Sequence, residues 1–316
     1  MTAATPAKPA GRSGPAGGRQ EALAGYAFIG IPMILFLVLN IGTTLYAFFI
    51  SLWDWNYRRG PEEFLGLGNF ERLVSDDLFH IAIRNTVYYA AIWVPLTMAI
   101  GLFLAVIVNQ KIRGQTFFRA AFYFPAVASS AAITVLWIFL LQPDGLFNGI
   151  RGAIGLNPLF EALGYGENHN WFGDSRSALN SVIALNAWTT SGTFMLFYLA
   201  SLQSISHDVY EAAAIDGASP WQTFWKVTFP LLKPGHFFVA TVGVIGALQL
   251  FDQALIAGST NGDPNYSLMT VVLYLYNAAF AQLDPGYAAA MGVVLFIVIF
   301  SSTLIQRRLF GNTQAA

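Results

Sequence analysis

The sequence predicts an all-α membrane protein that crosses the bilayer several times. Of its 316 residues, 55% are hydrophobic and only 10% are charged. An average soluble domain has about 25% charged residues, so this chain has too few charges to keep a surface of its size in water. The chain also contains long segments without charge, and about 20 apolar residues in a helix cross the ~30 Å hydrocarbon core of a bilayer.

Six segments are long enough to cross the membrane. Five contain no Asp, Glu, Lys or Arg, and the sixth contains only Asp252. They are residues 25–52, 85–110, 120–143, 177–206, 234–258 and 285–306. Each is far longer than the roughly 10-residue alternating strands of a membrane barrel, so we expect six transmembrane helices.

The distribution of basic residues predicts the orientation. Six spans place both termini on the same side of the membrane. If that side is the cytoplasm, ten of the 16 basic residues lie in cytoplasmic segments and the remaining six in outer loops. Basic residues favour the cytoplasmic side, so we expect both termini to be cytoplasmic.

Residues 25–310 are expected to form a single transmembrane domain. Residues 1–24, which are rich in Pro, Gly and Ala, are expected to be a disordered cytoplasmic tail, and residues 311–316 a short C-terminal tail. The first span is longer than the 7–15-residue apolar core of a signal peptide, so we expect it to be retained as an anchor.

Several function classes are excluded by composition. A net charge of −1 gives no general electrostatic surface for nucleic acid. The absence of cysteine excludes disulfides, thiolate metal sites and cysteine nucleophiles. The four histidines lie far apart, and no catalytic triad or pair of intramembrane carboxylates can be argued, so we expect no catalytic residue, no metal site and no enzymatic activity.

The polar loop at residues 206–234 predicts two short helices joined by a tight turn. Asp208 is expected to cap the first helix, residues 209–216, and Gly217 to end it in a left-handed conformation. Ser219 followed by Pro220 then predicts a second helix start, with Gln222 at the third position. A simple connection needs only a few residues, so this loop presents a rigid structure to the cytoplasm.

An alternative is that this loop is an amphipathic hairpin lying in the membrane interface. Trp221, Phe224 and Trp225 would then lie among the lipid headgroups.

The residue pattern favours another interpretation of the loop. Glu211-Ala212-Ala213, Gly217 and then Val227-Thr228-Phe229-Pro230 resemble the "EAA…G…I-LP" loop of permease subunits in ABC importers. Nine residues separate Gly217 from Val227, as in that motif, and Val and Phe replace its Ile and Leu.

Further segments resemble the carbohydrate-type (maltose-like) permeases of the binding-protein-dependent transport system inner-membrane component family. They are Gly66–Phe70, Asn85-Thr86, Asn170–Phe172, Asp252 after Gln249, and Gly286–Ala288, so the resemblance extends from about Tyr26 to Phe310. Many relatives carry Gly-Gly-Pro after the fifth span, whereas this chain has Ser259–Pro264, a different turn-forming stretch that weakens any inference about the solute.

The resemblance implies a type I ABC importer permease-like fold and a set of partners. These are a second permease subunit in a heterodimer, two nucleotide-binding ATPase subunits, an extracytoplasmic solute-binding protein and membrane lipid, in the inner membrane of a prokaryotic cell. The chain has no GxxxxGK[ST] motif, so it cannot be its own P-loop ATPase. We expect it to hold no cofactor, with ATP bound by a partner subunit.

In the family the EAA loop docks into the ATPase subunit. By that resemblance Glu211 would pair with a basic group of the ATPase, Ala212 and Ala213 would allow close approach, and Gly217 would set the turn. Asp216 would cap or pair locally, or would simply be solvated.

Two groups of polar residues within the spans are candidates for a solute pathway. Ionisable residues inside a membrane often mark such pathways. One group consists of Asn186 and Thr190, which share a helix face, with Trp188 nearby in the sequence. The other consists of Gln249 and Asp252 at helical spacing, with Gln253 beside them. Polar groups beside aromatic rings suit a sugar. The alternative is that these side chains only hold the helices together, and Asp252, near the outer end of its span, would then reach water or cap a helix.

The expected function is that of a permease subunit of an ATP-driven importer for a sugar or sugar-like solute. A secondary transporter or channel is the alternative, but ion-driven carriers usually place several ionisable residues in their spans, and this chain has one.

Overall fold

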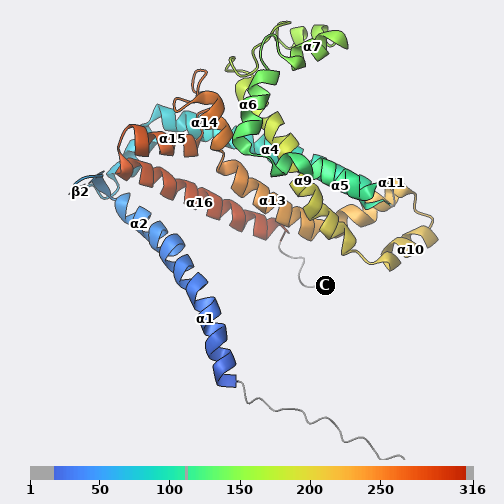
Figure 1. The fold of residues 1–316 in the computed structure, drawn as a ribbon, viewed down its shortest axis with the longest axis horizontal. Helices are drawn as coiled ribbons and strands as arrows, with labels where there is room; N and C mark the ends of the chain where they lie inside the picture. The colour runs from blue at the N-terminus through green and yellow to red at the C-terminus, as the bar shows by residue number, and fades with distance from the viewer. Residues whose placement is uncertain (1–17, 111–112, 311–316) are drawn as a thin grey trace, which may run out of the picture. The chain divides into compact units, whose positions relative to one another are not determined.

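The computed structural model describes residues 18–110 and 113–310, and most of these residues are helical (Figure 1). The all-α expectation is confirmed. Five helices are long and apolar enough to cross a membrane, and a sixth span is formed if two helices that meet at a sharp bend are counted together. Residues 1–17 of the tail expected over residues 1–24, and the whole tail expected over residues 311–316, lie outside the described residues.

The described chain divides into two compact units, the first ending at Phe49 and the second beginning at Ile50. A single domain over residues 25–310 stays a prediction. In the first unit, α1 (Gly18–Phe36) continues through a π-helical segment (Leu37–Gly42) into α2 (Thr43–Ile50). Helix α1 begins at Gly18 and not after residue 24, because the intervening sequence Gln-Glu-Ala-Leu-Ala consists of good helix formers. No residue is buried in the most apolar stretch of this helix, which is typical of a surface made for lipid or another subunit.

The core of the second unit is built from four long helices: α4 (Asp77–Asn109), α9 (Ala178–Gln203), α13 (Lys233–Leu248) and α16 (Pro285–Phe310). Helix α4 packs along both α9 and α13, and α13 also packs against α16 (Figure 1). Their shared core is aromatic and contains Tyr89, Trp93, Phe194 and Tyr198.

The expected third span, residues 120–143, is broken. Helices α5 (Gln115–Val127) and α6 (Ser130–Leu140) meet at an angle of 93°. Between them the backbone of Ala128 is extended and that of Ser129 is not helical, so the helical hydrogen bonds are interrupted there. The Ser129-Ser130 pair favours this break, because serine side chains compete for backbone hydrogen bonds outside helices.

The expected fifth span is also interrupted. Helix α13 ends at Leu248, and α14 (Asp252–Gly258) begins after three non-helical residues. Asp252 stands in the first turn of α14, where a negative charge is favoured by the exposed backbone N–H groups and the helix dipole. The break therefore exposes backbone and polar side chains inside a span, which is tolerated where they line a cavity.

The second span begins earlier than residue 85, because Asp76 caps α4 by accepting hydrogen bonds from the backbone of Leu78 and Phe79. Its other carboxylate oxygen accepts hydrogen bonds from the hydroxyls of Tyr274, in α15 (Val271–Tyr276), and Tyr287, in α16. Partial burial opposes the charge, but these four hydrogen bonds lower the pKa of Asp76 below its ordinary value. This carboxylate ties three helices together at one end of the unit.

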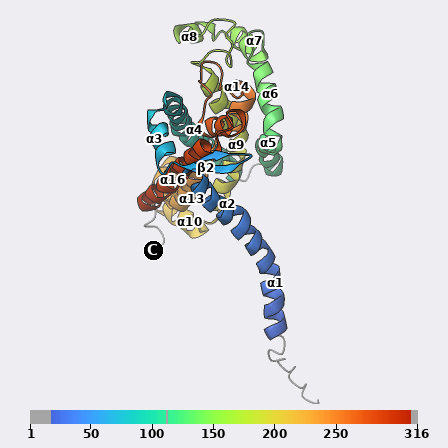
Figure 2. The same ribbon diagram turned by 90° about the vertical axis from the view of Figure 1, so that its left-hand side faces the viewer.

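The segments between spans carry small ordered structures. Strands β1 (Trp53–Asn56) and β2 (Gly60–Phe64) form an antiparallel hairpin followed by α3 (Gly68–Ser75). Helices α7 (Leu146–Ala153) and α8 (Asn157–Ala162) follow α6 (Figure 2). Buried Arg151 of α7 donates hydrogen bonds to Asn157 and to the Gly166 and Glu167 carbonyls, which orders this loop.

Candidate functional site: a coupling loop and a membrane cavity

The loop after α9 forms the two expected helices, α10 (His207–Ile215) and α11 (Pro220–Thr223). Helix α11 begins as the sequence predicts, with Pro220 as its first residue. The backbone N–H of Gln222 donates to the Ser219 hydroxyl, and the backbone N–H of Ser219 donates to the Gln222 side chain, which forms a capping box. The first cap differs from the prediction. Ser206 and not Asp208 caps α10, because its hydroxyl accepts the backbone N–H of Asp208.

Gly217 joins the two helices at a φ of +72°. This is the left-handed conformation expected at that position, which a β-branched residue adopts only with strain. The turn therefore depends on glycine and fixes the direction of α11 relative to α10.

The EAA residues of α10 divide between its two faces. Ala213 is buried, whereas Glu211, Ala212 and Asp216 are exposed. The Glu211 carboxylate lies 3.4 Å from the imidazole of His207, one turn earlier, and two-thirds of its side chain remains exposed. A carboxylate so placed is free to meet a basic group on another protein.

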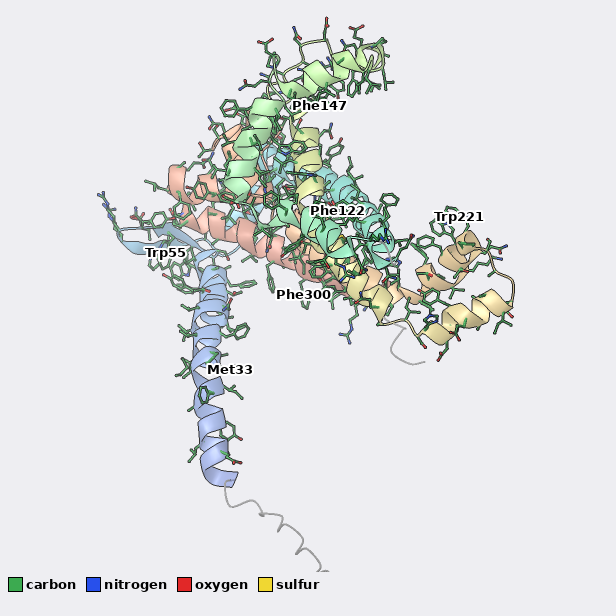
Figure 3. All side chains as sticks on the ribbon, turned by 45° about the vertical axis from the view of Figure 1, so that its right-hand side comes forward. Met33, Trp55, Phe122, Phe147, Trp221 and Phe300 are labelled. Atoms are coloured by element: carbon green, nitrogen blue, oxygen red, sulfur yellow. The ribbon has the colours of Figure 1, made fainter. Side chains whose placement is uncertain are left out.

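The loop also exposes large apolar side chains. Ile215 and Trp221 are 87% and 71% exposed, and Trp225 is about half exposed (Figure 3). Trp225 packs edge-on against both Trp221 and Phe224, so the aromatic rings form a continuous surface. Apolar surface displayed beside a carboxylate is typical of a contact with another macromolecule or with the membrane interface.

A cavity of about 430 Å³ lies among the long helices and is here named the Asp252 cavity. Its walls come from α4, α9, α13, α14 and the break between the last two. The lining residues are Tyr89, Trp93, Asn186, Thr190, Thr193, Phe194, Phe197, Val242, Gly246, Gln249, Leu250, Phe251, Asp252 and Gln253.

Five of the six residues expected along a solute pathway therefore line one cavity. Asn186 is buried and donates a hydrogen bond to the Tyr89 hydroxyl at 2.8 Å. Gln253 donates to Ser130, the first residue of α6, at 2.8 Å. Asp252 and Gln249 are exposed at the helix break.

Trp188 does not line the Asp252 cavity. It lies on another face of α9, where it is 45% exposed and its ring packs 5.9 Å from that of Trp137. The 100° step of a helix turns residue 188 about 200° away from residue 186, which separates the two side chains.

The sequence did not single out Tyr89 and Trp93, which form the aromatic wall of the cavity. Their rings stack at 5.7 Å on α4, and the buried indole N–H of Trp93 has no hydrogen-bond partner in the described part of the chain. The available signal was their spacing of four residues, which places two aromatic rings on one face of the second span.

No group of three acidic or histidine side chains able to hold a metal ion occurs within residues 18–110 and 113–310. The cavity combines hydroxyl, amide and carboxylate groups with stacked aromatic rings. Such a lining binds neutral hydroxylated molecules by hydrogen bonds and by contacts between C–H groups and rings.

Known proteins of similar sequence are transport permeases. Residues 97–312 match the family described as binding-protein-dependent transport system inner membrane component. The probable ABC transporter permease protein YurN of Bacillus subtilis (strain 168) is 32% identical, over 92% of this chain and 97% of that protein. The lactose transport system permease protein LacF of Rhizobium radiobacter is 33% identical, over 89% of this chain and 92% of that protein.

The fold is also known from solved structures. A bacterial ABC transporter involved in the import of the acidic polysaccharide alginate matches with a TM-score of 0.77 at 19% identity, covering 93% of this chain and 97% of that one. The long sequence match and the shared helical architecture agree. The chain therefore belongs to the binding-protein-dependent transport system inner membrane component family, the permease subunits of binding-protein-dependent importers.

Proposed function

We propose that the Asp252 cavity is part of the translocation pathway for a sugar or sugar-like solute. The observation that carries this proposal is the convergence of polar residues from α9, from the break after α13 and from α14 on one cavity with an aromatic wall. Its volume of about 430 Å³ lies within the roughly 300–1,000 Å³ of small-molecule sites. The names of relatives support a sugar, since they include permeases for lactose and for arabinooligosaccharides.

In this proposal the energy comes from a separate ATPase that binds ATP, and the chain itself holds no cofactor. The contact is the loop 206–234, with Glu211 as the charged anchor, exposed Ala212 allowing close approach, and Gly217 fixing the turn; Ala213, which is buried, packs the helix onto the rest of the chain. Asp216, exposed at the end of α10, stabilises the turn locally or contacts the ATPase. The exposed carboxylate beside exposed aromatic rings supports this role.

The complete transporter would contain this chain paired with a different permease chain, two ATPase subunits and a solute-binding protein outside the membrane. One solved structure of similar fold is an alginate transporter in complex with a periplasmic protein that carries an alginate pentasaccharide, which supports the last partner. The chain would lie in a prokaryotic inner membrane with both termini in the cytoplasm, as the distribution of basic residues predicts.

Uptake into proteoliposomes that contain the purified complex, the binding protein and internal ATP tests the proposed function. A panel of mono- and oligosaccharides should contain at least one solute whose uptake requires ATP and falls at least tenfold in Asp252→Ala. Uptake that is driven by an ion gradient without ATP would instead indicate a secondary transporter.

A further inference from the structure

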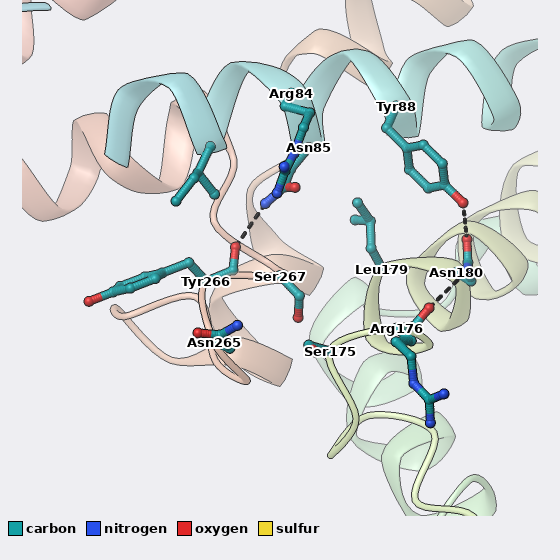
Figure 4. A pocket seen from close by; sticks show the side chains of 11 residues that line it. Arg84, Asn85, Tyr88, Ser175, Arg176, Leu179, Asn180, Asn265, Tyr266 and Ser267 are labelled. Atoms are coloured by element: carbon teal, nitrogen blue, oxygen red, sulfur yellow. Dashed lines mark hydrogen bonds between the residues drawn. The ribbon is translucent and has the colours of Figure 1, made fainter. Parts of the chain in front are cut away.

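A second cavity, of about 390 Å³, lies apart from the Asp252 cavity and shares none of its lining residues; it is here named the Arg84 cavity (Figure 4). It is bounded by the early turns of α4, the start of α9 and the segment that follows the cis Asp263–Pro264 bond. Its lining residues are Ile81, Arg84, Asn85, Tyr88, Ser175, Arg176, Leu179, Asn180, Asn265, Tyr266 and Ser267.

The wall of the Arg84 cavity is rich in hydrogen-bond donors. Nine of these eleven side chains carry an N–H or O–H donor, and none of the described residues that line it is acidic. The charge of Arg176 is already matched, because its guanidinium donates to Asp174 at 2.8 Å and holds the pKa of that carboxylate at about 2. Arg84 is exposed and, within residues 18–110 and 113–310, forms no ion pair and no side-chain hydrogen bond, so its guanidinium is available to an anion.

The same wall is held in a conformation that is costly to form. Asn265 and Tyr266 are consecutive non-glycine residues with φ values of +50° and +56°, a region that a bulky tyrosine rarely adopts. Buried Asn85 fixes this segment by donating a hydrogen bond to the carbonyl of Tyr266 at 2.8 Å (Figure 4). It also donates one to the carbonyl of Met269 at 3.0 Å. Strained backbone that the surroundings hold in place is concentrated at binding and catalytic sites.

Two further parts of the cavity wall present polar groups to a ligand, the Ser267 hydroxyl and the Tyr88–Asn180 pair. The hydroxyl of Ser267 is buried and has no partner in the described part of the chain. On the opposite side, Tyr88 donates to the Asn180 side chain at 2.9 Å, and Asn180 donates in turn to the Arg176 carbonyl at 3.1 Å (Figure 4). These bonds orient two polar side chains toward fixed positions before any ligand arrives.

The size and the charge of the cavity identify the class of ligand. A volume of about 390 Å³ is typical of a small-molecule site and is far more than one side chain of a partner protein would fill. The two cavities also differ in charge, since Asp252 is the only charged residue described in the wall of one, and the other has an unpaired arginine and no carboxylate. A neutral sugar would leave this arginine unmatched, whereas an oxyanion forms charge-assisted hydrogen bonds with it.

We propose that the Arg84 cavity binds a small hydroxylated molecule that carries a carboxylate or phosphate group. The oxyanion contacts Arg84 and the Ser267 hydroxyl, and the hydroxyl groups of the ligand contact Asn180, Tyr88 and Asn265. This is a binding site in addition to the solute pathway, and its occupation does not require transport.

Equilibrium dialysis with the purified complex in lipid nanodiscs, without the solute-binding protein, tests this site. Two pairs of probes distinguish the chemistry, glucuronate against glucose and glycerol 3-phosphate against glycerol, and each pair is measured at low and at high salt. The wild-type complex should bind at least one anionic probe about tenfold more tightly than its neutral counterpart, and salt should reduce that preference. The pair that shows the preference identifies the anion as carboxylate or phosphate.

Substitutions of Arg84 test whether the preference for anionic probes arises in the Arg84 cavity. Arg84→Gln should abolish it, and Arg84→Lys should keep most of it because the charge remains. Arg58→Gln is the matched control, since Arg58 is exposed beside the β1–β2 turn and does not line the cavity. Equal binding of charged and neutral probes by the wild type, a preference that survives Arg84→Gln, or the same loss in Arg58→Gln would each overturn the proposal. Because the readout is binding, a failure of sugar uptake leaves this result unchanged.

Discussion

Asp252 and Asn186 reach the same cavity from two different helices, and each has a distinct setting. Asn186 is buried against Tyr89, whereas Asp252 is exposed at the start of α14. A polar side chain in a span either contacts solute or holds helices together, and the two roles have different consequences when the side chain is removed.

Replacing either residue should therefore separate transport from assembly. We expect Asp252→Ala and Asn186→Leu to reduce solute uptake at least tenfold, which corresponds to about 1.4 kcal/mol, while the complex still assembles. Uptake and the yield of purified complex are measured together. Asp144→Asn, in the exposed turn before α7, is the control for a lost carboxylate. Poor assembly of both pathway variants would instead assign these residues to helix packing.

The lowered pKa of Asp76 predicts that the stability of the protein depends on pH. Its pKa is lowered in the folded protein, so its contribution to stability is complete above the unfolded pKa of about 3.8 and is lost as the pH falls through the lower folded value. We expect Asp76→Asn to lower Tm by about 2–4 °C near neutral pH, since hydrogen bonds to a charged group are lost. The difference from wild type should shrink below about pH 4.

Thermal unfolding in detergent across this pH range measures the effect. The neighbouring Asp77→Asn is the matched control, because Asp77 is exposed and caps nothing. A difference in Tm that does not depend on pH would show that the carboxylate charge of Asp76 is not what stabilises the cluster.

At the scale of elements, the paired loop helices depend on a single backbone conformation. Gly217 has a φ of +72° and no neighbour close enough to obstruct a side chain, so the obstacle to substitution is the backbone and not space. Asparagine tolerates this region far better than a β-branched residue.

Two substitutions at Gly217, which differ in how well the new residue tolerates a positive φ, therefore test whether uptake depends on this turn. Gly217→Val should change the angle between α10 and α11 and abolish solute uptake, and Gly217→Asn should retain most of it. Both proteins should reach the membrane at normal levels, because the turn lies outside the spans. Immunoblotting of membranes alongside uptake provides the measurement, and equal uptake by the two variants would contradict a role for the turn.

The sequence predicts those helices whose ends and lengths are determined by residues close together in the chain. Long uncharged segments predicted the spans, and the Ser219-Pro220-Gln222 pattern predicted a capping box, because both are local. The breaks at 128–129 and 249–251 were not predicted, since small or single polar residues in an apolar segment are equally compatible with a continuous helix. A hydrogen bond between Gln253 and Ser130, 123 residues apart, joins the helices that follow the two breaks, and no local sequence pattern can show such a tertiary contact.

The same distinction applies to the candidate site. Polar residues at helical spacing on α9 and at the start of α14 were visible in the sequence, and they line one cavity. Tyr89 and Trp93 belong to an apolar span whose rotation only the packing of α4 against α9 determines. Trp188 was included for its proximity in sequence, and the helical rotation places it against Trp137 instead.

At the scale of the whole molecule, orientation in the membrane decides whether the loop can meet an ATPase. The chain has no cysteine, so single cysteines report sidedness without background. Ser219→Cys in the loop and Asn168→Cys after α8 are both exposed positions and should be labelled from opposite sides of the membrane. Labelling of Ser219→Cys in intact cells by an impermeant maleimide would reverse the predicted orientation.

We propose that the exposed carboxylate of Glu211 joins this permease to a separate ATPase. The measurement is the amount of ATPase that copurifies with the tagged chain. Wild type should retain it, and Glu211→Lys should lose it, because reversal of one charge at a buried pair costs more than the roughly 2–5 kcal/mol of losing a partner. Glu161→Lys, on exposed α8, should behave as wild type. Wild-type retention of the ATPase by Glu211→Lys, together with wild-type uptake, would contradict the claim.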